Sequence, residues 1–177
     1  MDQPGKSIVL IGMMGAGKSS VGRCLQRRTG ADLFDTDDAV TKKLGLSIVE
    51  IFKRFGEEKF RHAETEVLRE LAPTKPTIFV TGGGAILREE NVNLLKRLGF
   101  VVWLDADEGT LCERATRRGH RPLLQTENPR ARLAALVAER NPLYARAADL
   151  RIDTSTMDHD EVADIVLSKV QELFATR

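Results

Sequence analysis

A glycine-rich segment behind an apolar run is the first part of this chain that could do chemistry. Residues 12–19 read GMMGAGKS and follow the apolar residues 7–11. The spacing G-x-x-x-x-G-K-S turns a strand sharply into a helix, so that backbone N–H groups converge on an anion at the helix N-terminus. Lys18 can reach the β- and γ-phosphates of a nucleotide, and the Ser19 hydroxyl can bind Mg²⁺. The residues expected to hold the nucleotide phosphates are Gly15, Ala16, Gly17, Lys18, Ser19 and Ser20.

Three carboxylates follow at a point where a strand is expected to become a helix. These are Asp35, Asp37 and Asp38. Acids at a helix start often serve only as caps. Beside a bound nucleotide, one of them could hold the water shell of Mg²⁺, and another could accept a proton from an acceptor hydroxyl or orient it. Asp105, at the end of another expected strand, is a second candidate for the metal carboxylate.

Glycines and arginines supply the remaining candidates. Gly82, Gly83 and Gly84 follow an apolar strand, where the absence of side chains lets backbone amides approach a substrate closely. Arginine can bind a carboxylate or phosphate through two parallel N–H bonds. The candidate arginines are Arg61, Arg121 and Arg140. Each also has an interpretation without a ligand, since Arg61 could form a surface ion pair with Glu64, and Arg121 and Arg140 could be solvated surface residues. Together they fit a kinase that acts on a small acid.

The segment from Arg114 to Arg132 contains six arginines and one acid, interrupted by Gly119, Pro122 and Pro129. Glycine and proline break regular structure, so this segment is predicted to be a mobile basic flap. Such a flap would exclude water, which competes with the acceptor for the phosphoryl group.

Apolar periodicity and capping signals predict the elements that must position these residues. The expected strands are 7–11, 31–35, 77–81, 101–105 and 150–153. The expected helices are 18–28, 37–44, one from Ser47 to Gly56, one through Phe60 to about Pro73, 91–98, 108–118, 128–140 and a last one capped by Asp158. Strands that alternate with helices predict a parallel sheet covered on both faces, with ligands at the carboxyl ends of the strands.

The composition restricts the class of protein. With 177 residues the chain fits one domain, and its net charge of +1 argues against a nucleic-acid or membrane surface. Cys24 and Cys112 lack metal-site spacing and are interpreted as reduced buried thiols. The absence of a signal region or membrane-length apolar stretch predicts a cytoplasmic location. The three histidines are interpreted as polar surface residues, and Trp103 as part of the core.

Nearly end to end, the chain resembles the shikimate kinase family, small P-loop kinases related to the nucleoside monophosphate kinases. The resemblance is carried in order by GMMGAGKS, FDTDD, GEEKFRHAE, VTGGGA, RPLL and ERNPLY. It implies a three-layer α/β P-loop kinase fold with a five-stranded parallel sheet in a single domain, residues 1–177. Within that domain it implies a helical substrate-binding region at about 36–72 and a lid at about 114–130. We expect a monomer.

The same resemblance implies roles for the candidate residues. Lys18 and Arg121 would lie at the transferred phosphoryl group, and Ser19 with Asp35 at Mg²⁺. Asp37 would bind the shikimate hydroxyls and act as base or orienter. The shikimate carboxylate would be held by Arg61 and Arg140, in a pocket also lined by Gly82, Gly83 and Gly84. Arg117 and Arg118 both remain candidates for an adenine contact, which the backbone of residues 154–156 could also make.

The resemblance also implies an activity. The expected reaction is ATP-dependent phosphorylation of the shikimate 3-hydroxyl, giving shikimate 3-phosphate and ADP in aromatic amino acid biosynthesis. One alternative is a gluconate kinase-like enzyme for another hydroxy acid. The other is a catalytically silent nucleotide-binding regulator, which the full set of phosphoryl-transfer residues disfavours.

Overall fold

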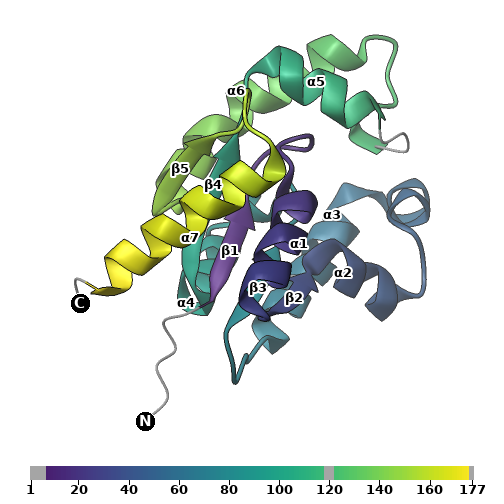
Figure 1. The fold of residues 1–177 in the computed structure, drawn as a ribbon. Coiled ribbons are helices and arrows are strands. Elements are labelled where there is room, and N and C mark those ends of the chain that lie inside the picture. The colour runs from purple at the N-terminus through teal and green to yellow at the C-terminus, as the bar shows by residue number, and fades with distance from the viewer. Residues whose placement is uncertain (1–6, 118–121, 176–177) are drawn as a thin grey trace.

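Five parallel strands form a single sheet at the centre of the structure (Figure 1), a computed structural model that describes residues 7–117 and 122–175. The strand order is β2-β3-β1-β4-β5. The strands are β1 (Ile8–Ile11), β2 (Asp32–Asp35), β3 (Thr77–Val80), β4 (Phe100–Asp105) and β5 (Leu150–Asp153). The predicted fold class is confirmed, and each strand lies within a residue or so of its predicted range.

Helices cover both faces of this sheet. Helices α1 (Lys18–Thr29) and α7 (His159–Ala175) pack against each other on the face nearer the viewer in Figure 1. On the other face α4 (Glu89–Leu98) and α6 (Pro129–Ala147) contact β4. Helix α5 (Glu108–Arg117) packs on α6 above the sheet. The central strands β1, β3 and β4 are therefore buried on both sides, as their apolar runs require, whereas the edge strands β2 and β5 are only partly buried.

A helical pair beside the sheet has a small core of its own. Helix α2 (Thr36–Leu44) packs on α3 (Ile48–Glu70) around apolar side chains that include Val40, Ile51 and Phe60. The predicted capping box at Ser47 is present. The predicted break at Gly56 is present, because Gly56 has the non-helical angles φ 78° and ψ 173° and the two helical segments of α3 meet there at a kink.

Helix α6 is longer than predicted. The prediction ended at about Arg140, but the helix continues through Pro142 to Ala147. Tyr144 and Ala147 are buried against the main core, and this packing outweighs the loss of one backbone donor at the proline. Two short 3-10 turns were also not predicted, η1 (Ala85–Leu87) and η2 (Pro122–Leu124).

Strand register brings three loops to one edge of the sheet. Val80 of β3 lies level with Leu10 of β1 on one side and with Asp35 of β2 on the other. The segments that follow these strands therefore begin side by side. They are the glycine-rich loop, the start of α2 and the triple-glycine turn.

Other expectations can be checked in the same structure. Trp103 is buried, as predicted. Both cysteines are free thiols, but only Cys24 is buried, so the prediction was wrong for Cys112, which is partly exposed on α5. None of the helices in the described part of the chain combines the length and the apolar character needed to cross a bilayer.

Candidate active site

The glycine-rich loop wraps closely around the end of β4. At Gly12 the backbone has φ 141°, and a Cβ atom there would lie 2.2 Å from the carbonyl oxygen of Leu104, so only glycine fits. The Lys18 ammonium donates to the carbonyl oxygens of Gly12 at 2.7 Å and Met13 at 3.0 Å. These bonds fold the lysine back over the concavity that the loop amides enclose.

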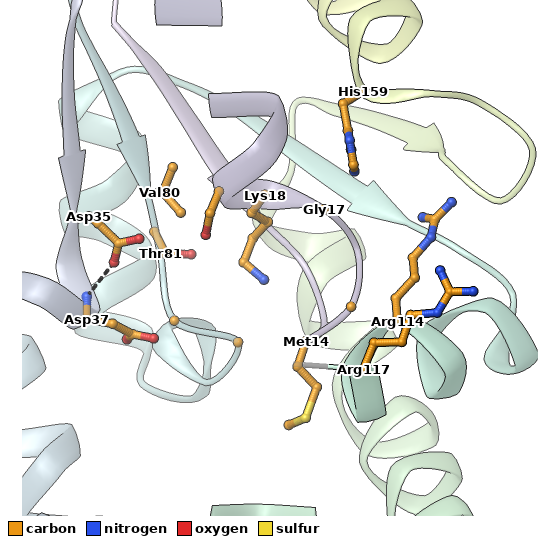
Figure 2. A pocket seen from close by; sticks show the side chains of 14 residues that line it. Met14, Gly17, Lys18, Asp35, Asp37, Val80, Thr81, Arg114, Arg117 and His159 are labelled. Carbon is orange, nitrogen blue, oxygen red and sulfur yellow. Dashed lines mark hydrogen bonds between the residues drawn. The ribbon is translucent and has the colours of Figure 1, made fainter. Parts of the chain in front are cut away.

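A pocket opens over this loop (Figure 2). Of the residues predicted to hold phosphates, Gly15, Gly17, Lys18 and Ser19 line it, together with Asp35 and Asp37. Ala16 is buried beneath the loop, and Ser20 lies further along α1. Neither of these two residues is part of the pocket wall.

Asp35 serves as a helix cap and as part of the pocket wall. Its Oδ1 accepts hydrogen bonds from the backbone N–H groups of Asp37 at 2.9 Å and Asp38 at 3.4 Å, so the capping interpretation is correct for this residue. Burial, followed by the negative charges of Asp37 and Asp38, raises the pKa of Asp35 to about 6, against the two backbone hydrogen bonds that lower it. A carboxylate in such surroundings is stabilised by a nearby cation.

Asp105, the second candidate for a metal carboxylate, has other partners. Its Oδ1 accepts from the backbone N–H of Ala106, and its Oδ2 accepts from the Arg151 guanidinium at 2.7 Å. It does not line the pocket. Of the two candidates, only Asp35 is therefore placed to face a bound nucleotide.

A second pocket adjoins the first and contains two buried arginines. Arg61 is 7% exposed and Arg140 is 2% exposed, and both line this pocket with Gly82, Gly83 and Gly84. The interpretation of Arg61 as a surface ion pair was wrong. It does pair with Glu64, at 3.0 Å, but both residues are inside the protein.

The two arginines differ in their surroundings. The Arg61 guanidinium donates to Glu57 and to Glu64. Arg140 Nε and Nη1 are buried and have no hydrogen-bond partner among the described residues. Buried donors are nearly always paired in folded proteins, so these two point to an anion that the pocket accepts.

Glu64 was missed as a site residue. It is fully buried, its Oε2 accepts from Arg61, and its Oε1 has no hydrogen-bond partner in the described part of the chain. Burial, followed by repulsion from Asp37, raises its pKa to about 7 against the opposing charges of Arg61 and Arg140. A signal was available, because Glu64 shares a helical stripe with Phe60, Val67 and Leu68.

The triple glycine makes room for these charged side chains. A Cβ at Gly84 would lie 2.3 Å from Arg61 Cζ, and one at Gly82 would lie 2.5 Å from Asp37 Oδ1. The carbonyl of the glycine between them, Gly83, accepts a hydrogen bond from the buried hydroxyl of Tyr144. The turn therefore fixes the position of the Gly83 carbonyl oxygen and leaves room for the side chains of Arg61 and Asp37.

Arginines and a histidine form the wall of the first pocket opposite Asp35 (Figure 2). Arg114, Arg117 and His159 all line it. Arg114 is held by Thr154, to whose hydroxyl and carbonyl oxygens it donates at 3.2 and 3.1 Å. Sequence reasoning missed Arg114, which no local pattern separates from the other arginines of its run, and it missed the pocket position of His159. Arg118, His120 and Arg121 lie outside the described residues.

Asp37 connects the two pockets. Together with Met14, Gly82 and Gly83 it lines both of them, and it is the only carboxylate among these shared residues. One side chain can therefore face a group bound over the glycine-rich loop and a second molecule bound beside Arg61 and Arg140.

Comparisons with known proteins agree with this geometry. The family model for shikimate kinase matches residues 14–171. A shikimate kinase from Thermodesulfovibrio yellowstonii is 42% identical over 168 residues, which cover 95% of this chain and 96% of the relative. One from Symbiobacterium thermophilum is 45% identical over 168 residues, covering 94% and 97%. The solved structure of the shikimate kinase from Acinetobacter baumannii in complex with shikimate has a TM-score of 0.90 and 39% identity, covering 94% of this chain and 93% of that one. This chain therefore belongs to the shikimate kinase family.

Proposed function

We propose that this protein transfers the γ-phosphoryl group of ATP to the 3-hydroxyl of shikimate, giving shikimate 3-phosphate and ADP in aromatic amino acid biosynthesis. The observation that carries the proposal is the position of Asp37, which lines both the pocket over the glycine-rich loop and the pocket of the two buried arginines. A carboxylate at that boundary can contact the acceptor hydroxyl where it meets the donor.

The donor half would hold ATP. Backbone amides from Gly15 to Ser20 would surround the phosphates, and Lys18 would leave the loop carbonyls to contact the transferred group. Arg121 is proposed to stabilise the same group from the lid. Arg117 lines the pocket and is the proposed adenine contact, with Arg118 as the alternative. Arg114 also lines the pocket and is therefore a third candidate.

Magnesium is the proposed metal of this half. Asp35, whose pKa is raised by burial and by neighbouring acids, and Ser19 both line the nucleotide pocket, which fits a hard cation that prefers oxygen ligands. Among the described residues no group of three or more His, Cys, Asp or Glu side chains converges on a metal. A magnesium ion would therefore rest mainly on phosphate oxygens and water, and would neutralise charge on the phosphates.

The acceptor half would hold shikimate. Arg61 and Arg140 would bind its carboxylate, with Gly82, Gly83 and Gly84 along the ring, and Asp37 would bind the hydroxyls. A carboxylate held by two buried arginines would fix the ring, so that one hydroxyl faces the donor. Asp37 would then orient that hydroxyl or take its proton as the new O–P bond forms. The substrate region would be residues 36–72 and the lid residues 114–130 of a single domain, acting as a monomer in the cytoplasm.

An acceptor panel tests the proposal. ADP release would be followed in a coupled assay with shikimate, quinate and gluconate, and the phosphorylated position would be identified by phosphorus NMR of the product. Turnover with shikimate at the 3-hydroxyl supports the proposal. Activity confined to gluconate would instead establish the gluconate kinase-like alternative, and tight ATP binding without turnover on any acceptor would favour a silent nucleotide-binding regulator.

A further inference from the structure

Arg61, which lines the pocket proposed for the acid, already binds the carboxylate of Glu57 in the structure. Glu57 Oε1 accepts from Arg61 Nε at 3.2 Å and from Nη2 at 3.0 Å. Two adjacent guanidinium N–H groups form the edge that binds a carboxylate bidentately. Glu57 therefore occupies a binding edge that an incoming carboxylate needs.

The second carboxylate on Arg61 differs from the first in its exposure to solvent. Glu64 binds Nη1 at 3.0 Å and its side chain is 0% exposed, so it is held inside the protein. The Glu57 side chain is 37% exposed and lies directly after the kink at Gly56. Because the Glu57 side chain reaches solvent, water can replace Arg61 as its partner, whereas the buried Glu64 has no such access and stays on Arg61.

Arg140 provides the place where an acid can arrive. It lines the same pocket as Arg61, and its Nε and Nη1 are buried without partners among the described residues. A ligand carboxylate can bind these donors at once. Because Glu64 holds Nη1, the edge at which the acid can bind Arg61 through two parallel bonds is that of Nε and Nη2, which Glu57 occupies.

We infer that Glu57 is an internal competitor for the carboxylate of the acceptor and so sets the affinity of the acceptor pocket. The inference rests on the proposed function, in which the acceptor is a carboxylic acid. In the empty site Glu57 neutralises Arg61 and holds its guanidinium in place. On binding, the acid displaces Glu57, and part of the binding free energy is spent in breaking that ion pair.

Direct binding measurements on variants of Glu57 test this inference. The Kd of shikimate would be measured by isothermal titration calorimetry for the parent, Glu57→Gln and Glu57→Ala. Both substitutions should tighten binding by about two- to fivefold, the range expected for an ion pair with an exposed partner. Glu58→Gln is the matched control, because Glu58 is the next residue, is exposed and pairs with Arg88 instead. Its Kd should equal that of the parent.

A neutral analogue separates competition from other effects. Methyl shikimate cannot take the edge of Arg61 as a carboxylate, so the Glu57 variants should bind it no more tightly than the parent does. Equal or weaker shikimate binding by both Glu57 variants, with normal circular dichroism spectra, would overturn the inference, as would the same gain with the methyl ester. If the parent itself binds no shikimate, the proposed function fails, and the inference fails with it.

Discussion

The two halves of the site differ in how their buried polar groups are satisfied. In the donor half, Lys18 donates to two loop carbonyls and Asp35 caps α2. In the acceptor half, Arg140 Nε and Nη1 and Glu64 Oε1 are buried without partners among the described residues. An unsatisfied buried polar group costs about 1–3 kcal/mol, so the acceptor half is the less stable of the two without ligand. The difference indicates that the polar groups of the donor half find their partners within the protein, whereas those of the acceptor half find theirs in the bound substrate.

The largest expected effect comes from the residue shared by both halves. Asp37→Ala should lower kcat by about 10²- to 10⁴-fold, the usual contribution of a positioned proton acceptor, while the Kd of ATP stays the same. Stopped-flow kinetics and calorimetric ATP titration measure the two quantities. Asp38→Ala is the matched control, since Asp38 is the next residue but is exposed. Equal turnover in Asp37→Ala and the parent would remove Asp37 from the reaction.

Removing Arg140 should affect only the acceptor half. Arg140→Ala should weaken shikimate binding by about 2–5 kcal/mol, since the bound carboxylate loses a buried charged partner. ATP binding should not change. Arg146→Ala, on the exposed face of the same helix, is the control. A joint loss of ATP and shikimate binding would contradict the separation of the two halves.

The titration of Glu64 makes the acceptor half sensitive to pH. Its pKa is raised from 4.5 to about 7, so its contribution to stability is complete below pH 4.5 and is lost as the pH rises to about 7. An increase of this size in the pKa of Glu64 limits the loss to about 3 kcal/mol. Thermal unfolding of Glu64→Gln and the parent between pH 4.5 and 7.5 should show a flatter profile for the variant. Parallel profiles would mean that Glu64 ionises freely in the folded protein.

A methyl group in the triple-glycine turn should have the smallest effect. Gly84→Ala places Cβ 2.3 Å from Arg61 Cζ, so the guanidinium must shift. We expect shikimate affinity to fall by about 1–2 kcal/mol, in the lower range of overpacking effects. Gly83→Ala is the comparison, because its Cβ would meet nothing closer than 3.5 Å and should perturb binding less. If Gly83→Ala lost more shikimate affinity than Gly84→Ala, the Arg61 guanidinium would have to accommodate the methyl group at position 84 without losing its contact with shikimate.

The donor half was more predictable from the sequence than the acceptor half. The glycine-rich loop is contiguous, so its spacing alone predicts a strand, a turn and a helix with Lys18 and Ser19 in place. Arg61 and Arg140 are far apart in the chain. The arginines together suggested a kinase for a small acid, but only the resemblance to a family assigned this pair to the carboxylate. Their burial, and that of Glu64, depends on the packing of α3 and α6 against the turns η1 and η2, which no local pattern encodes.

Local signals also failed where tertiary packing decides the outcome. Pro142 suggests a helix end, yet α6 continues because Tyr144 is buried beyond it. The interpretation of His159 as a surface residue is confirmed, but its place in the pocket over the glycine-rich loop was not predicted. Neither fact can be obtained from the neighbours of these residues in sequence.

The stacking of Trp103 on Tyr144 gives the protein an internal optical reporter. Trp103 is the single tryptophan of the chain, its ring lies 5.7 Å from that of Tyr144, and the Tyr144 hydroxyl is bound to Gly83 in the acceptor pocket. Indole emission depends on the neighbouring dipoles and charges, and the Arg151 guanidinium lies 4.8 Å from the same ring. A ligand that shifts Gly83 or Tyr144 will therefore change the emission of one defined fluorophore, so that occupancy of the acceptor pocket can be followed without any label.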